Sequence, residues 1–491
     1  MSSSPSVRRS LAWSLLQRYV AFLIGIGTTI IISRLLTPAE IGIYSLCAAI
    51  VAIAHVMRDF GIGEYIIQEK DLNRSRLKAA FALAILTAWT AAVLLLLLRG
   101  IVADFYDEPG LRAVLSVLAL NFILLPFGTP AFALLSRELA FDRIFVITTV
   151  GTAVQSICAV SLAALGFSYM SLAWASVASS LSIFLLCTYF RPGDSWILPS
   201  LRGIDRVWRY GLAAAGSNVL INIGHQAHEF IIGRSFGFHD LGIFNRGSGL
   251  LMQFNTNIHH AIIRVATPTF AAHHRLGGSL ADHYTRGVSL YTSIAWPFFS
   301  FAAVMALPIM RLFFGLQWDE AAPIARLLAV GFFIGAVSAI APSLLAATGN
   351  VRANLRIQSF LMPLRVVVVL GAAFIGLKAV AAGISLLSLV GLALYTSQVS
   401  RIAGVPFAHI LGATRKSAVV TVVTMLPASL FLLLAGPALD SNPWLVLVAA
   451  LLTGLAWLVA VFVLRHEVGD EVRRAMGSLR RLAGNATGRI K

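Results

Sequence analysis

The sequence predicts an all-α polytopic membrane protein with fourteen transmembrane helices, built as two six-helix lobes followed by two C-terminal helices. Three observations support this prediction. Only 12% of the 491 residues are charged and 58% are apolar, whereas soluble domains carry about 25% charged residues. Apolar runs of about 20 residues, the length that crosses a bilayer, recur along the whole chain. The third observation is an internal repeat, described below.

Charged residues, Pro and Gly bound the apolar runs and define the expected helices in order. We place them at 11–33, 40–66, 78–98, 111–135, 144–165, 168–190, 207–232, 241–266, 285–314, 321–347, 354–376, 379–400, 417–436 and 443–464. We expect the first run to be a retained span and not a cleaved signal peptide, because Gln17 and Arg18 interrupt it and no small-residue cleavage site follows. The loops are too short to hold a separate soluble domain.

The distribution of basic residues predicts the orientation. Lys and Arg number 38 against 21 Asp and Glu, a net charge of +17, and most of the basic residues lie in alternate loops and in the two terminal segments. By the positive-inside rule both termini are expected to be cytoplasmic. The basic tail 465–491 is expected to lie against anionic lipid. Little soluble surface is left for a nucleic-acid site, so no nucleic-acid partner is expected.

An internal repeat divides the chain. The stretch IISRLLTPAEIGIY at 31–44 matches IIGRSFGFHDLGIF at 231–244, an offset of 200 residues. We therefore expect a first lobe at 1–200 and a second at 201–402, related by a pseudo-two-fold axis along the membrane normal. Two further helices follow at 403–464, before the tail. The cavity between two such lobes is the expected substrate site.

Ionisable residues inside the spans are the candidate functional groups, because each is costly in hydrocarbon. Arginine can grip a phosphate group with two parallel hydrogen bonds, so an anionic substrate is expected. The candidate substrate-binding arginines are Arg18, Arg58, Arg264, Arg246 and Arg365. Each of them also has a structural alternative, either a salt bridge to a neighbouring helix or snorkelling to lipid head groups. Arg34 and Arg234 recur at one repeat position and are expected to be structural.

A second polar cluster lies in the expected seventh span. His225, His228 and Glu229 share one helical face, and Asn218 and Asn222 continue it. The order H-x-x-H-E fits no familiar zinc motif, so no metal site is expected. Glu229, His225 and Asp59 of the second span are the candidates for ion coupling, and a plain interhelical polar contact is the alternative. The two asparagines could bind sugar hydroxyls or hydrogen-bond between helices. No phosphate-binding loop motif occurs, so an ion gradient or the membrane potential, and not a cofactor, is the expected energy source.

Two pairs of motifs carry a family resemblance. SRLLTPAEIGIYSL followed by RDFGIGEYIIQEKDL, and LGIFNRGSGLLMQ with IIRVATPTFAAHHR, resemble bacterial polysaccharide exporters of the multidrug/oligosaccharidyl-lipid/polysaccharide superfamily. The resemblance implies a flippase in the inner membrane of a bacterium. It would translocate undecaprenyl-diphosphate-linked oligosaccharide by alternating access, for exopolysaccharide or lipopolysaccharide biosynthesis. The resemblance also implies an arginine-lined cavity, here built from Arg18, Arg58 and Arg264. A polysaccharide polymerase and a chain-length regulator are the possible protein partners.

Three other functions fit the sequence less well. A multidrug-and-toxin cation antiporter of the same superfamily would need acidic residues to dominate the cavity, whereas arginines outnumber acids in these spans. A membrane polymerase, ligase or glycosyltransferase would need a large extracytoplasmic loop, and the acidic segment 104–108 is short. A scaffolding protein would not require so many charges within its spans.

Overall fold

The computed structural model describes residues 5–59, 61–195, 199–201, 204–442, 444–470 and 473. Within these residues the secondary structure is helical, and twelve helices are long and apolar enough to cross a membrane. The chain is therefore a multi-pass membrane protein, as predicted. The backbone, but not the side chains, is described for 5–12, 14–15, 194–195, 205–220, 436–437 and 439–441.

The chain divides into two compact units, Met1–Gly242 and Ile243–Lys491. Unit 1 begins with the helices α1 (Pro5–Leu35), α2 (Pro38–Asp59), α3 (Ile62–Gln68), α4 (Arg74–Tyr106), α5 (Gly110–Arg137), α6 (Phe141–Ala164), α7 (Met170–Phe190) and α8 (Pro192–Ser195). Helix α9 (Ile204–Arg275) runs through the boundary. Unit 2 continues with α10 (Leu280–Val304), α11 (Ala306–Phe313), α12 (Ala321–Gly335), α13 (Ala341–Ala347), α14 (Val351–Ala373), α15 (Leu377–Ala403), α16 (Phe407–Ser441) and α17 (Leu445–Val463), with short 3-10 turns at Leu316–Trp318 and Ala336–Ser338.

Twelve of the predicted spans coincide with the membrane-length helices. The other two, 207–232 and 241–266, fall in α9, which Gly237 interrupts with φ 84° and ψ −178°. Such a conformation suits only glycine, so the residue marks a break between two helical halves. The total of fourteen spans stays a prediction, since α9 is not among the twelve. The predicted lobe boundary at residue 200 stays a prediction, and the first compact unit extends to Gly242, within α9.

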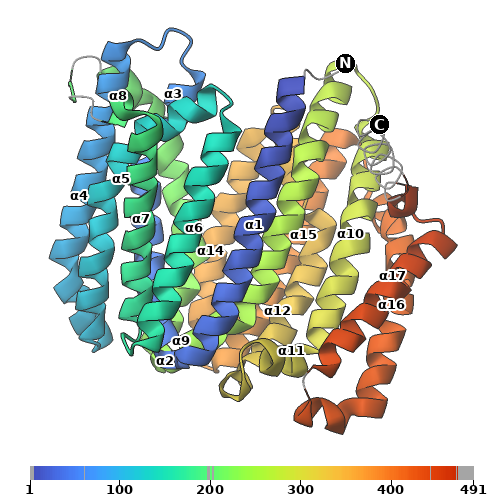
Figure 1. Ribbon diagram of the computed structural model, residues 1–491. Coiled ribbons are helices and arrows are strands. Elements are labelled where there is room, and N and C mark those ends of the chain that lie inside the picture. The colour runs from blue at the N-terminus through green and yellow to red at the C-terminus, as the bar shows by residue number, and fades with distance from the viewer. Residues whose placement is uncertain are drawn as a thin grey trace, which may run out of the picture. The chain divides into compact units, whose positions relative to one another are not determined.

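Unit 1 is a bundle in which α4 lies along α5, α6 along α7, and α1 along α6 (Figure 1). One cluster of buried side chains joins α3, α4 and α5 around Ile66, Leu83 and Phe81. The Trp13 ring contacts Phe145 at a centroid distance of 5.0 Å and so attaches the start of α1 to α6. In a bilayer the exposed leucines on the outer faces of these helices meet lipid and not water.

Helix α2 starts with a capping box. The Glu40 carboxylate accepts from the backbone N–H of Thr37 at 2.7 Å and from the Thr37 hydroxyl at 2.9 Å. In return the Glu40 N–H donates to Thr37 Oγ1 at 3.4 Å. Pro38 occupies the first helical position, where its missing N–H is not needed. The segment Thr37–Glu40 therefore fixes where α2 begins.

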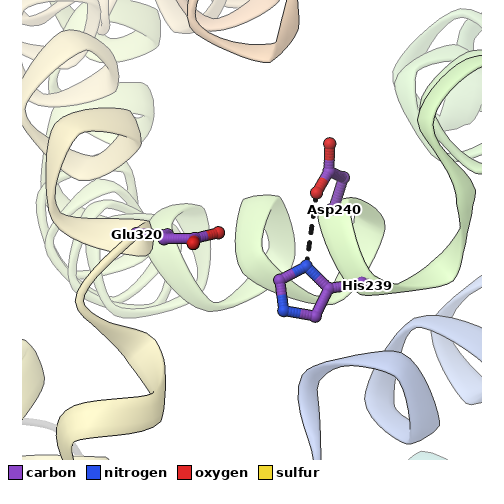
Figure 2. A group of neighbouring side chains, drawn as sticks. All are labelled: His239, Asp240 and Glu320. Atoms are coloured by element: carbon purple, nitrogen blue, oxygen red, sulfur yellow. Dashed lines mark hydrogen bonds and ion pairs between the residues drawn. The ribbon is translucent and has the colours of Figure 1, made fainter.

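The two copies of the repeated motif contact each other reciprocally inside unit 1. A Cβ atom on Gly42 would lie 1.9 Å from the carbonyl oxygen of Phe238, and one on Gly242 would lie 1.9 Å from that of Pro38. Each glycine thus packs against the first helical residue of the other copy. Only glycine permits so close a backbone approach. Beside this crossing, His239 Nδ1 lies 3.3 Å from Asp240 Oδ1 (Figure 2).

The core of unit 2 consists of α10 packed on α16 and α12 packed on α15 (Figure 1). Two indoles tie helices together by donating to main-chain oxygens. Trp296 Nε1 donates to Phe333 O, and Trp457 Nε1 donates to Ser293 O, both at 2.8 Å. These bonds satisfy buried polar groups that would otherwise be costly in an apolar core.

A buried histidine attaches the segment after α17 to the rest of unit 2. His466 is 1% exposed, and its Nδ1 accepts from Val468 N–H at 3.2 Å. Its Nε2 lies 3.3 Å from Ser289 Oγ and 3.2 Å from Ser417 Oγ. Because Val468 N–H can only donate, the neutral ring carries its hydrogen on Nε2. Burial, with a smaller effect of the Lys416 charge, lowers the pKa of His466.

Candidate functional site

Arg58 lies where the second span breaks. Helix α2 ends at Asp59, and Gly61, with φ 64°, allows the chain to turn before α3 begins. The Arg58 carbonyl, freed from the helical ladder, accepts a hydrogen bond from Thr87 Oγ1 of α4 at 3.1 Å. The Arg58 guanidinium forms an ion pair with the Asp59 carboxylate, and the two side chains are 18% and 61% exposed. A predicted substrate residue and a predicted coupling residue therefore neutralise each other.

A pocket of about 300 Å³ opens beside this pair, between α3, α5 and α7. It is largely apolar, and its polar lining groups are Arg58, Glu64, Thr129, Ser136 and Ser180. Volume and lining are those of a small-molecule site, mostly hydrophobic and aromatic with a few polar groups. Two prolines inside α5, at 126 and 130, remove backbone hydrogen bonds next to the pocket.

The predicted polar face of α9 is formed in part. The Glu229 side chain is buried, and its carboxylate lies 3.6 Å from His228 Nε2. Asn222 and His225 also interact with neighbouring groups. The side chain of Asn218 lies outside the described residues. A buried carboxylate beside an imidazole can take part in proton transfer or serve as a fixed polar contact.

In unit 2, Arg246 is enclosed by aromatic rings. Its guanidinium carbon lies 5.1 Å from the Phe314 ring centroid and 5.0 Å from that of Trp318. Next to these rings Arg311 and Asp319 form a salt bridge with an Nη2–Oδ2 distance of 2.7 Å. The predicted substrate residue Arg246 thus has two cation–π partners within its own unit.

Arg365 lies on a polar face of α14. Gln358 and Asn354 lie on the same face, and the Tyr395 hydroxyl of α15 joins them. It accepts from Gln358 Nε2 and donates to Asn354 Oδ1, both at 2.9 Å. Arg365 Nε is buried without a hydrogen-bond partner. The structure gives the Arg365 side chain no ion pair among the residues it describes. Its position is about 21 Å from the start of α14 and about 12 Å from the end, well inside the span.

The remaining predicted arginines differ in their surroundings. Arg264, on the second half of α9, is exposed and makes no hydrogen bond or ion pair with a described residue. Arg18, on α1, is partly buried and does interact with neighbouring groups. The structure brings Arg58 together with Asp59, and His228 with Glu229. It places Arg365 and Arg264 apart from any protein counter-charge that it describes.

Several polar groups of these sites were not predicted. Thr129 and Ser136 are single hydroxyls in the apolar second half of α5, and Gln358 and Tyr395 lie on two different helices. The sequence holds one hint for α5, because two prolines four residues apart in a span mark disturbed backbone. Nothing in the sequence pairs Gln358 with Tyr395.

Comparison with known proteins places the chain among related sequences. The profile of the family described as polysaccharide biosynthesis protein matches residues 31–323. The lipopolysaccharide biosynthesis protein WzxC of Escherichia coli K12 is 24% identical over 353 residues, covering 71% of each chain. The succinoglycan biosynthesis transport protein ExoT of Rhizobium meliloti is 24% identical over 335 residues, covering 67% of this chain and 66% of its own.

Among solved structures, the lipid II flippase MurJ in its inward closed conformation superposes with a TM-score of 0.72. The superposition covers 93% of this chain and 99% of MurJ, at 11% sequence identity. At that identity the likeness shows a shared fold. It agrees with the all-helical membrane architecture predicted from the composition and the apolar runs.

Proposed function

The chain belongs to the polysaccharide biosynthesis protein family, and from this premise we propose that it is a flippase for lipid-linked oligosaccharide. The proposed substrate is an undecaprenyl-diphosphate-linked repeat unit, which moves from the cytoplasmic to the outer leaflet of the inner membrane. Both termini face the cytoplasm in this proposal. Transport serves exopolysaccharide or lipopolysaccharide biosynthesis and requires no chemical change of the substrate.

The observation that carries the proposal is Arg365 of α14, which has no ion-pair partner in the part of the chain that the structure describes. An arginine at the centre of a span costs roughly 2.5–3.5 kcal/mol or more. Most buried charges offset that cost with a counter-charge, but Arg365 has none among the described residues. A diphosphate group supplies the missing charge and matches the planar guanidinium with two parallel hydrogen bonds. Arg264 offers a second cation of the same kind in unit 2.

The proposed mechanism is alternating access driven by an ion gradient or by the membrane potential. Glu229 is the better candidate for ion coupling, because it is buried and lies beside His228. Asp59 already balances Arg58, so its protonation would release that arginine. His225 is the third candidate. Anionic lipids, a polymerase and a chain-length regulator are the partners proposed with this function.

Translocation in proteoliposomes tests the proposal. A fluorescent undecaprenyl-diphosphate oligosaccharide is placed in one leaflet, and its appearance in the other is followed by quenching. Arg365→Gln should slow translocation about ten- to hundredfold, as expected for the loss of charge-assisted hydrogen bonds. Arg365→Lys should retain part of the rate. Arg356→Gln is the matched control, since it removes an exposed arginine from the same helix.

Two results would count against the proposal. One is a wild-type protein that moves no lipid-linked substrate but exports a cationic dye, as an antiporter would. The other is an Arg365→Gln variant that translocates as fast as the Arg356→Gln control. That result would show that Arg365 does not bind the diphosphate.

A further inference from the structure

The pocket between α3, α5 and α7 differs in charge from the surroundings of Arg365 and Arg264 in unit 2, for which the described residues supply no counter-charge. Arg58 is balanced by Asp59, and the second charged group of the lining is the Glu64 carboxylate. Glu64 makes no hydrogen bond or ion pair with another described residue. The charged side chains that line the pocket therefore carry no net positive charge to attract a phosphate group. A ligand of this pocket is neutral and rich in hydrogen-bond donors.

The hydroxyl groups of α5 are oriented to accept hydrogen bonds. Thr129 Oγ1 donates to Leu125 O, and Ser136 Oγ donates to Phe132 O, both at 3.0 Å. Each hydroxyl has one hydrogen and two lone pairs, so the oxygen of each keeps its acceptor capacity. Because Thr129, Phe132 and Ser136 follow each other at i, i+3 and i+7, they share one face of the helix.

Aromatic and open surfaces complete the lining. Phe132 of α5 and Phe184 of α7 both face the pocket. Gly63 of α3 also lines it, and a Cβ atom there would have nothing within 4 Å. An apolar ring face beside several acceptors matches a pyranose, which has a C–H face and a rim of hydroxyl groups. Lipid tails are a poor match, because they would leave Glu64 and the hydroxyl oxygens unsatisfied.

We propose that this pocket binds one neutral sugar residue of the transported oligosaccharide, through Glu64, Thr129 and Ser136 as acceptors and Phe132 as the ring platform. The inference rests on the proposed flippase function and assigns the sugar to unit 1. A pocket of about 300 Å³ is at the lower end of small-molecule sites, which fits a single sugar and not a whole repeat unit.

Equilibrium binding of soluble sugars to the full chain in nanodiscs tests the proposal by calorimetry. The probes are the methyl glycosides of glucose, galactose, mannose, rhamnose, N-acetylglucosamine and glucuronic acid, together with inorganic pyrophosphate. Thr129→Val combined with Ser136→Ala removes the two hydroxyl acceptors. Thr148→Val is the control, because that hydroxyl makes the same kind of bond, to Ile144 O at 2.8 Å, on α6 outside the pocket.

We expect wild type and control to bind at least one neutral glycoside more tightly than the glucuronide. The double variant should bind it about tenfold more weakly, since two hydrogen bonds are lost. Pyrophosphate binding should not change. Phe132→Leu, which keeps an apolar side chain, should weaken sugar binding as well and serves if the double variant does not fold.

The proposal is overturned if no neutral glycoside binds the wild type, if the glucuronide binds best, or if the pocket variants bind as the control does. Sugar binding is measured without translocation. The protein could bind sugar in a way that depends on Thr129 and Ser136 and yet move no lipid. That result would refute the flippase function but support the sugar site.

Discussion

Gly42→Ala should destabilise the protein, although alanine is the better helix former. An added Cβ atom would lie 1.9 Å from the carbonyl oxygen of Phe238 and 2.7 Å from its carbonyl carbon. Ordinary contacts of a Cβ atom begin at 3.4 Å, so the two backbones must separate by about 1.5 Å to admit it. A main-chain carbonyl inside a helix cannot rotate away as a side chain can.

The expected size follows from two opposing effects. Overpacking a well-packed contact costs about 1–3 kcal/mol, and a rigid backbone obstacle belongs at the upper end. Replacing glycine by alanine inside a helix contributes about 1 kcal/mol in the other direction. We therefore expect the free energy of unfolding to fall by about 2 kcal/mol. Gly25→Ala is the control, since a Cβ there would have nothing within 4 Å, and it should be neutral or stabilising.

Unfolding in mixed micelles, titrated with sodium dodecyl sulfate, measures the effect. Gly242→Ala should behave like Gly42→Ala, because its Cβ would lie equally close to Pro38 O. The double variant should lose less than the sum of both, since one separation of the helices relieves both clashes. A Gly42→Ala protein as stable as Gly25→Ala would refute the close backbone crossing.

Two further predictions concern stability. Thr37→Ala should lower the free energy of unfolding by about 1 kcal/mol, because the cap of α2 is lost, whereas Thr37→Ser, which keeps the hydroxyl, should not; the same micelle titration measures both. Burial lowers the pKa of His466 below its usual value of about 6.5, so the unfolded chain binds a proton first and stability should fall as the pH drops below about 6.5. In His466→Gln the thermal unfolding midpoint should no longer fall with pH for this reason. A pH dependence equal to that of the wild type would contradict the conclusion that His466 is buried as a neutral imidazole.

The membrane spans could be predicted because long apolar runs can be recognised in the sequence alone, without knowing how the helices pack. Twelve runs coincide with membrane-length helices, although some limits differ by up to ten residues, as at 285–314 against Leu280–Val304 and at 417–436 against Phe407–Ala435. The pairing of Arg58 with Asp59 could not be predicted, because neighbouring residues inside a regular helix point to different faces. The rule does not hold here, since α2 ends at Asp59 and the chain turns at Gly61. At that break the Thr87 hydroxyl of α4 lies 3.1 Å from the Arg58 carbonyl, a contact between two helices that the sequence does not reveal.

The pocket was not predicted for a different reason. An isolated threonine or serine in an apolar helix usually bonds to its own backbone, and Thr129 and Ser136 do so. Their second role, as acceptors on a shared surface, depends on how α3 and α7 pack against α5. The arginines within the spans were predicted to be functional because a charge in hydrocarbon costs free energy. That cost does not tell which of the arginines has a partner in the folded protein. Arg246 has two aromatic rings, whereas Arg365 has no described counter-charge.

The two units therefore hold different chemistry, and this separates affinity from selectivity in the proposed function. Arg365 is attracted to any diphosphate, whatever sugar it carries, because the attraction is between a cation and an anion. The side chains that line the pocket of Thr129 and Ser136 carry no net positive charge. Under the proposal this pocket distinguishes sugars only by the arrangement of their hydroxyl groups. Variants of Arg365 should consequently weaken the binding of every lipid-linked substrate by a similar factor. Variants of Thr129 and Ser136 should instead change the order of binding affinity among substrates with different sugars.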